Sequence, residues 1–124
     1  MQSDVKEVLN RIPEFSEFIK LTDNIRELSF RKLVLEKDIK TMEADVFKKA
    51  VTDEKYFING KSPAISYIEN AYKHTGFDGE ILPLREELAK VSSDLDHEKL
   101  SLEIYKQMLE VWRTLSANTR VLES

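Results

Sequence analysis

Residues 14–51 read "EFSEFIKLTDNIRELSFRKLVLEKDIKTMEADVFKKAV", and this stretch decides the fold. Its apolar residues recur at intervals of three and four, which places them on one side of an α-helix as a heptad seam. The seam consists of Phe18, Leu21, Ile25, Leu28, Leu35, Ile39, Met42 and Val46, with Lys32 at its one polar position. The pattern predicts a single long helix over residues 14–51.

A second stretch, residues 80–120, carries a matching seam. It begins near Gly79 or Glu80, with Asp78 as the expected helix cap and Pro83 in or near the first turn, where proline is tolerated. The seam consists of Ile81, Leu84, Leu88, Val91, Leu95, Leu102, Tyr105, Leu109 and Trp112, with Glu98 as its polar position. Two matching seams predict an antiparallel helical hairpin of the coiled-coil type, whose register the sequence leaves open.

The segment between these helices contains strong turn and helix-start signals. Asn59 and Gly60 both accept positive φ angles, so they predict a turn. Ser62 and Pro63 are typical of a helix cap followed by the first helical position, which predicts a short bridging helix over residues 63–74. Its expected inward face holds Ile65, Ile68 and Tyr72.

Composition agrees with a helical protein. The 124 residues include only three glycines and three prolines, while 34% are charged, a balance typical of long solvated helices. Ser3 can cap a further short helix over residues 4–12. The sequence therefore predicts an all-α fold in which residues 1–124 form one elongated helical domain.

Both long helices also carry apolar residues that their seams do not use. On the first helix these are Phe30, Leu33 and Val34, and on the second they are Leu100, Ile104, Met108, Val111 and Leu115. Wide exposed apolar patches are uncommon on monomers, so this surplus is expected to meet the short helices or another copy of the chain. Together with Tyr105 and Trp112, the second set forms a candidate oligomer or partner interface, and we expect a homo-oligomer.

Charge and composition exclude several classes of protein. The net charge of −4 is unlike that of a protein with a cationic surface all round, and the lack of cysteine excludes disulfides and zinc sites built on sulfur. The first residues, "MQSDVKEVLN", have no secretory signal pattern, and no apolar run reaches the length of a membrane span. The sequence predicts a cytoplasmic protein that makes no membrane contact.

No motif in the sequence predicts catalysis. Gly60-Lys61-Ser62 resembles the end of a phosphate-binding loop, but Lys55 stands where that loop requires a glycine, and the preceding segment is helical. Asp94 and His97 share a helix face, yet two ligands are too few for a metal site. We expect no enzyme activity, cofactor, metal or small-molecule substrate.

A cluster of basic and aromatic residues surrounds the predicted turn. Cationic side chains beside aromatic rings can follow a phosphate backbone and stack on exposed bases, which is how single strands are held without sequence reading. The candidate nucleic-acid residues are Lys48, Lys49, Lys55, Tyr56, Phe57 and Lys61. The alternative is that the aromatic residues pack the connection and the lysines are ordinary surface residues.

The same residues carry a resemblance to a known family. A long helix followed by "DEKYFINGK", a short connection and a second long helix ending in "LEVWRTLSANTR" resembles the phage recombination-mediator family. The matching residues are Tyr56, Phe57, Gly60 and Lys61 after the first helix, and Asn118 and Arg120 near the end of the second. The sequence departs from that family at Val121, where a glycine would follow the arginine, and in its lower positive charge.

What the resemblance implies is an oligomeric accessory protein that handles single-stranded DNA in recombination or replication. Its partners would be single-stranded DNA and a recombination or replication protein, and its location would be the host cytoplasm if a phage encodes it. The alternative prediction is a protein–protein interaction or assembly module that binds no nucleic acid.

Overall fold

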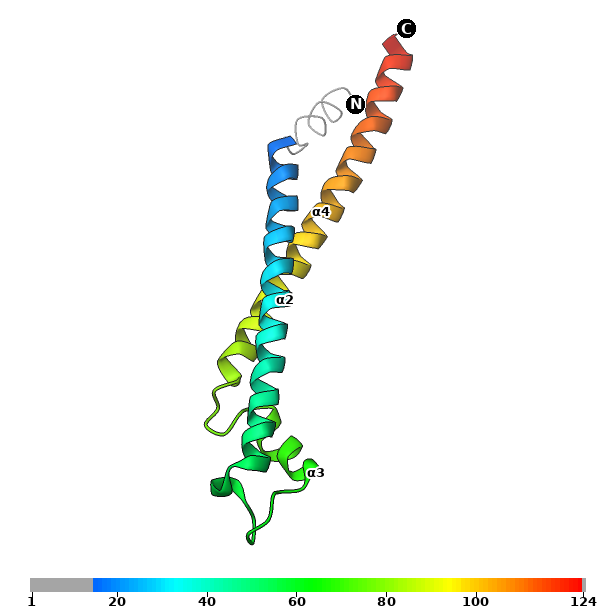
Figure 1. The fold of residues 1–124 in the computed structure, drawn as a ribbon. Coiled ribbons are helices and arrows are strands. Elements are labelled where there is room, and N and C mark those ends of the chain that lie inside the picture. The colour runs from blue at the N-terminus through cyan, green and yellow to red at the C-terminus, as the bar shows by residue number, and fades with distance from the viewer. Residues whose placement is uncertain (1–14, 124) are drawn as a thin grey trace. The chain divides into compact units, whose positions relative to one another are not determined.

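The computed structural model describes residues 15–123, which form an all-α helical hairpin (Figure 1). The elements follow in the order α2 (Phe15–Thr52), η1 (Glu54–Tyr56), α3 (Ile65–Ile68), η2 (Glu69–Lys73) and α4 (Leu82–Glu123). In the described residues, the only strand-like pairing is an isolated antiparallel bridge between Ile58 and Lys61. The helix expected over residues 4–12 lies outside the described residues.

The two long helices confirm the predictions made from the periodicity of the sequence. The helix predicted over residues 14–51 is α2, and the one predicted over 80–120 is α4, with each boundary shifted by no more than three residues. All positions of the first seam are buried or half-buried, Lys32 included. The same holds for the second seam, including Glu98, except that Trp112 is 36% exposed.

The chain divides into two compact units, which we describe separately. Unit 2 comprises residues 29–93 and contains the end of α2, the connecting segment and the start of α4. Its core is formed by Ile39, Val46 and Ile81, against which Met42, Tyr72, Phe77, Leu84 and Leu88 pack. This core is therefore built from side chains of α2, of the connecting segment and of α4.

Unit 1 contributes residues 15–28 and 94–123 to the described structure. Here the ring of Phe18 on α2 packs against that of Tyr105 on α4, with ring centroids 5.4 Å apart. Phe15 stacks on Phe18 at 6.0 Å. Leu95 and Tyr105 are buried, at 3% and 5% exposure. A narrow apolar and aromatic seam thus joins the two helix segments of this unit.

The bridging helix begins later than the sequence predicts. The helix starts at Ile65, its N-cap is Ala64, and no side chain caps it. Ser62 Oγ instead donates a hydrogen bond of 3.0 Å to the carbonyl of Val51, one of the terminal carbonyls of α2 that lack a partner within the helix. The predicted cap at Ser62 is therefore wrong, because its hydroxyl donates to a carbonyl at the C-terminal end of α2 and not to the start of α3.

The inward face of this short helix is also narrower than predicted. Ile68 is fully buried and Tyr72 is half-buried, but Ile65 is 62% exposed. The placement of Ile65 on the inward face is wrong, because Ile65 occupies the first helical position and α3 and η2 together cover only Ile65–Lys73. Gly76 ends the segment with a φ of +86°, and its amide donates to the carbonyl of Tyr72.

Candidate functional site

The predicted turn forms the tip of the connecting segment. Asn59 and Gly60 have φ angles of +54° and +75°, and the amides of Ile58 and Lys61 donate to each other's carbonyls at 2.9 and 3.1 Å. This is the geometry of a tight two-residue hairpin turn. The turn predicted at Asn59 and Gly60 is confirmed, and the amide of Lys61 is used within it.

An aromatic cluster packs behind this tip. The ring of Tyr56 stacks on that of Phe77 with centroids 4.0 Å apart, and Tyr72 lies 4.7 Å from Phe77. Tyr67 meets Tyr72 edge-on at 6.0 Å. Burial, followed by the neighbouring Tyr67 hydroxyl, raises the pKa of Tyr72. One face of the Tyr56 ring is thus occupied by Phe77, so Tyr56 packs the connection and does not offer both faces to a ligand.

The predicted basic residues have side chains that face solvent. Lys48, Lys49, Lys55 and Lys61 are exposed, and Phe57 is half-buried. The Lys55 Nζ atom lies 5.6 Å from the centroid of the Tyr56 ring, within the range of a cation–π contact. Unit 2 therefore brings all six candidate nucleic-acid residues into one compact unit, with the lysines facing solvent.

A carboxylate orders the loop that precedes α4. Glu80 Oε1 accepts a hydrogen bond of 3.1 Å from the amide of Phe77, and its Oε2 accepts one of 2.8 Å from the amide of Asp78. The amide of Asp78 is the largest cause that lowers the pKa of Glu80, and the charge of Lys49 also contributes. The expected cap at Asp78 is wrong, because α4 begins at Leu82, beyond the position that Asp78 could cap.

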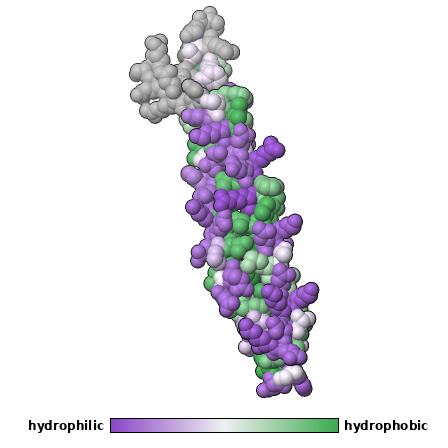
Figure 2. Space-filling model, turned by 60° about the vertical axis from the view of Figure 1, so that its left-hand side comes forward, coloured by the Kyte–Doolittle hydropathy of each residue, from purple (hydrophilic) through white to green (hydrophobic). Residues whose placement is uncertain are grey.

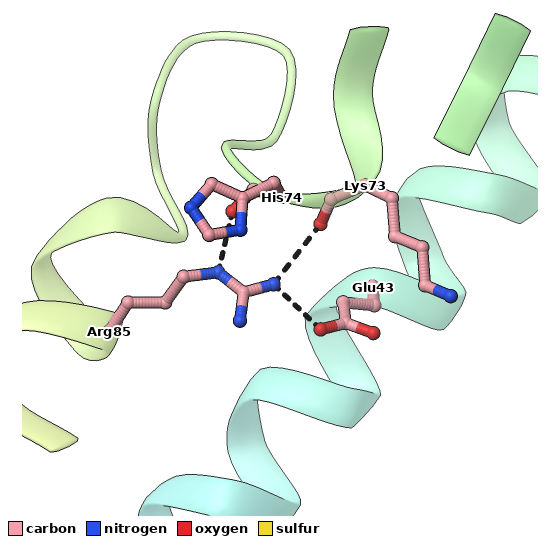
Figure 3. A network of polar contacts seen from close by, with 4 residues as sticks. All are labelled: Glu43, Lys73, His74 and Arg85. Carbon is pink, nitrogen blue, oxygen red and sulfur yellow. Dashed lines mark hydrogen bonds and ion pairs between the residues drawn. The ribbon is translucent and has the colours of Figure 1, made fainter. Parts of the chain in front are cut away.

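Arg85 joins three chain segments of unit 2 (Figure 3). Its Nε donates to the carbonyl of His74 at 2.7 Å, and its Nη2 donates to Glu43 Oε1 at 2.7 Å and to the carbonyl of Lys73 at 3.4 Å. The cation therefore satisfies carbonyls at the end of η2, where the helix dipole favours positive charge. The sequence does not single out Arg85, because no short-range pattern pairs it with residues 11 and 42 positions away.

The surplus apolar residues of α2 remain uncovered within unit 2. Phe30, Leu33 and Val34 are 69%, 65% and 39% exposed. Beside them a shallow groove of about 470 Å³ follows α2 and is lined by Leu33, Glu36, Lys37, Lys40, Thr41 and Ala44. On the face drawn in Figure 2, apolar atoms interrupt the polar surface. The short bridging helix, one of the expected covers, does not bury these three residues.

The candidate interface of α4 divides into two groups. Leu100, Ile104 and Val111 are 60%, 49% and 51% exposed. Tyr105 faces the seam of unit 1 and is buried there. Met108 and Leu115 are half-buried, and Trp112 lies at 36% exposure. The structure therefore leaves an outward apolar group on α4 that is distinct from the buried Tyr105.

A second groove, of about 270 Å³, lies between α2 and the bridging segment. Its lining is mixed in charge and consists of Lys40, Glu43, Ala44, Phe47, Ile68, Glu69 and Lys73. Between residues 15 and 123, no group of three or more histidine or acidic side chains is arranged to hold a metal ion. Over the same residues, no helix is both long and apolar enough to cross a membrane.

Comparisons with protein-family models, curated proteins and solved structures find no match for this chain.

Proposed function

We propose that this protein is a non-catalytic helical assembly protein that associates with further copies of itself. The observation that supports the proposal is the outward position of Leu100, Ile104 and Val111, each about half or more exposed on α4. Completing the burial of such side chains contributes about 1 kcal/mol each. Burial of these three side chains against another copy would therefore favour association.

Solution mass tests this proposal. We expect light scattering to give a multiple of the 14.5 kDa chain mass for the wild type, and a mass close to 14.5 kDa for Ile104→Glu. Lys99→Glu is the matched control, because Lys99 is exposed on the same helix but off the apolar stripe. A wild type that stays monomeric at millimolar concentration would refute self-association.

A second candidate function is the handling of single-stranded DNA as an accessory protein of recombination or replication in the cytoplasm. It is supported by the exposed lysines Lys48, Lys49, Lys55 and Lys61 gathered in one unit, where an oligomer would repeat them. Since one face of Tyr56 packs on Phe77, base stacking would depend on Phe57 and on Tyr67, which is 45% exposed.

Salt dependence separates the two candidates. Contacts to phosphates release counterions, so the affinity for single-stranded DNA should fall steeply with ionic strength, whereas apolar self-association should barely respond. We expect a fluorescence-anisotropy titration with an oligonucleotide at low salt to show binding, and Lys55→Ala with Lys61→Ala to weaken it about tenfold by removing two phosphate contacts. Absence of binding by the assembled wild type at low salt would eliminate the DNA function and leave the assembly function intact.

A further inference from the structure

Each long helix carries a second heptad series on the side opposite its seam. In α2 the second series lies two residues after each seam position, which at about 100° per residue is roughly 200° around the helix. We call this series the outer α2 face, and it consists of Phe30, Val34, Lys37, Thr41, Ala44 and Lys48. All six residues are exposed within unit 2. The face is apolar at its first two positions and basic at Lys37 and Lys48.

The second series of α4 has the same spacing. We call it the outer α4 face, and it consists of Leu100, Ile104, Gln107, Val111 and Thr114, all of them exposed within unit 1. Steps of four, three, four and three residues match those from Phe30 to Ala44. Two helices with such series can pack as a coiled coil, in which each side chain enters a space between side chains of the facing helix.

The threonines of the two faces favour such packing. Thr41 Oγ1 donates to the carbonyl of Lys37 at 3.0 Å, and Thr114 Oγ1 donates to the carbonyl of Glu110 at 3.0 Å. Both hydroxyls are thus satisfied within their own helices. Burying Thr41 and Thr114 against another helix therefore leaves neither hydroxyl group without a partner.

Along one of their two borders, the two faces carry opposite charges. Lys40 lies one residue before Thr41 on the outer α2 face, and Glu103 and Glu110 lie one residue before Ile104 and Val111 on the outer α4 face. All three charged side chains are exposed, and the structure gives them no ion-pair partner among the described residues. When two helices pack antiparallel, their corresponding borders meet, so Lys40 of one helix would lie beside a glutamate of the other.

Pairing of like faces would bring like charges together. Two outer α2 faces would place Lys40 against Lys40, and two outer α4 faces would place Glu103 and Glu110 against their own copies. Like charges at such positions oppose association. The groove of about 470 Å³ beside Lys37, Lys40 and Thr41 also offers a hollow in which a helix can lie.

We infer that self-association pairs unlike faces, with the outer α2 face of one copy packing antiparallel against the outer α4 face of another. The inference rests on the proposed assembly function and adds the partner surface. Because the two faces differ, each copy keeps one face of each kind for a neighbour, which generates rings or open chains unless two copies satisfy each other.

Single cysteines test the pairing directly, because the natural chain has none. Thr41→Cys and Ile104→Cys are made in separate full-length chains, which are then mixed and oxidised. We expect a disulfide-linked pair in the mixture to form at least about tenfold faster than in either variant alone, since docked thiols have a high effective concentration. Asp38→Cys is the matched control, because Asp38 is exposed on α2 but off the outer face.

Charge reversal tests the border contact. We expect Lys40→Glu to weaken association about tenfold, and Glu103→Lys with Glu110→Lys to do the same, while the combination of all three restores it. Circular dichroism of each variant checks that the helices remain.

The outcomes separate this inference from the assembly function. A monomeric wild type would refute both. An assembled wild type whose Thr41→Cys or Ile104→Cys chains link fastest with themselves would overturn the pairing of unlike faces alone. Cross-links from Glu103 or Glu110 to Lys6 of the same chain, formed by a carbodiimide that couples carboxylates to amines and identified on mixed isotope-labelled copies, would assign the outer α4 face to the N-terminal segment and overturn the inference.

Discussion

The two units use the same pair of long helices but bury them differently. In unit 2, α2 buries Leu35, Ile39, Val46 and Ala50, each at 6% exposure or less. In the described part of unit 1, α2 contributes only half-buried seam residues such as Phe18. The heptad pattern is equally regular in both. The difference shows that a heptad seam selects which side of a helix turns inward but does not by itself set how deeply each seam residue is buried.

The largest expected effect tests the closed core of unit 2. Ile81 is fully buried, so Ile81→Ala should lower the free energy of unfolding by about 2–4 kcal/mol through lost burial and the cavity left behind. Urea denaturation followed by circular dichroism measures it. Ile65→Ala is the matched control, because Ile65 is 62% exposed and its loss should cost less than about 0.5 kcal/mol. Equal losses at the two positions would break the distinction between core and surface in this unit.

A polar contact of unit 2 is expected to have the next largest effect. Arg85→Met removes the donors to the Lys73 and His74 carbonyls and leaves the partly buried Glu43 carboxylate unpaired, so it should cost about 1–3 kcal/mol. Arg31→Met removes the ion pair between Arg31 and Glu87, whose side chains are 57% and 41% exposed. Its loss should lower the free energy of unfolding by no more than about 0.5 kcal/mol. If both variants unfold at the same urea concentration, Arg85 does not tie the connecting segment to α2.

The aromatic contact of unit 1 should give a smaller energy. A double-mutant cycle with Phe18→Leu and Tyr105→Leu isolates the ring pair from the other contacts of each residue, and we expect a coupling of about 0.5–1.5 kcal/mol. The four proteins are compared by thermal or urea unfolding. If the two losses of unfolding free energy simply add, burial of apolar area stabilises the seam of unit 1 and the ring contact contributes nothing specific.

The smallest effect concerns pH. The folded pKa of Glu80 is lowered by hydrogen bonds from backbone amides, so its contribution to stability is complete above the unfolded value of about 4.3 and is lost as pH falls through the lower folded value. The stability advantage of the wild type over Glu80→Gln should therefore shrink as pH falls below about 4. Urea unfolding at pH 7 and pH 3 measures the advantage. An advantage that stays constant over this range would mean that Glu80 does not order the loop as a carboxylate.

Much of the fold could be predicted because it depends on local chemistry. The two long helices follow from intervals of three and four residues, and the turn at Asn59-Gly60 follows from residues that accept positive φ. The caps at Ser62 and Asp78 were predicted wrongly, because Ser62 Oγ donates to the distant carbonyl of Val51 and because α4 begins only at Leu82, beyond Asp78. Short-range patterns can propose a donor or an acceptor, but they do not choose between two partners.

The candidate site shows the same division. The sequence identified Lys55, Tyr56 and Lys61 as one basic and aromatic group, and the structure brings them into unit 2. It could not show that Tyr56 stacks on Phe77, since the two are 21 positions apart and that contact requires the connecting segment to fold back. Nor could it identify Arg85, whose acceptors lie on α2 and at the end of η2, far from Arg85 in the chain.

By itself the sequence determined that this protein is helical, that each long helix turns a heptad seam inward, and that each carries an apolar surplus outside that seam. These are properties of residue spacing along one helix, which a single chain segment fixes locally. The exposure of that surplus, the burial of Tyr105 beside the exposed Ile104, and the contacts of Arg85 with Glu43 and the end of η2 depend instead on the three-dimensional packing. Such contacts join residues distant in the chain, so their partners are chosen by packing and not by spacing.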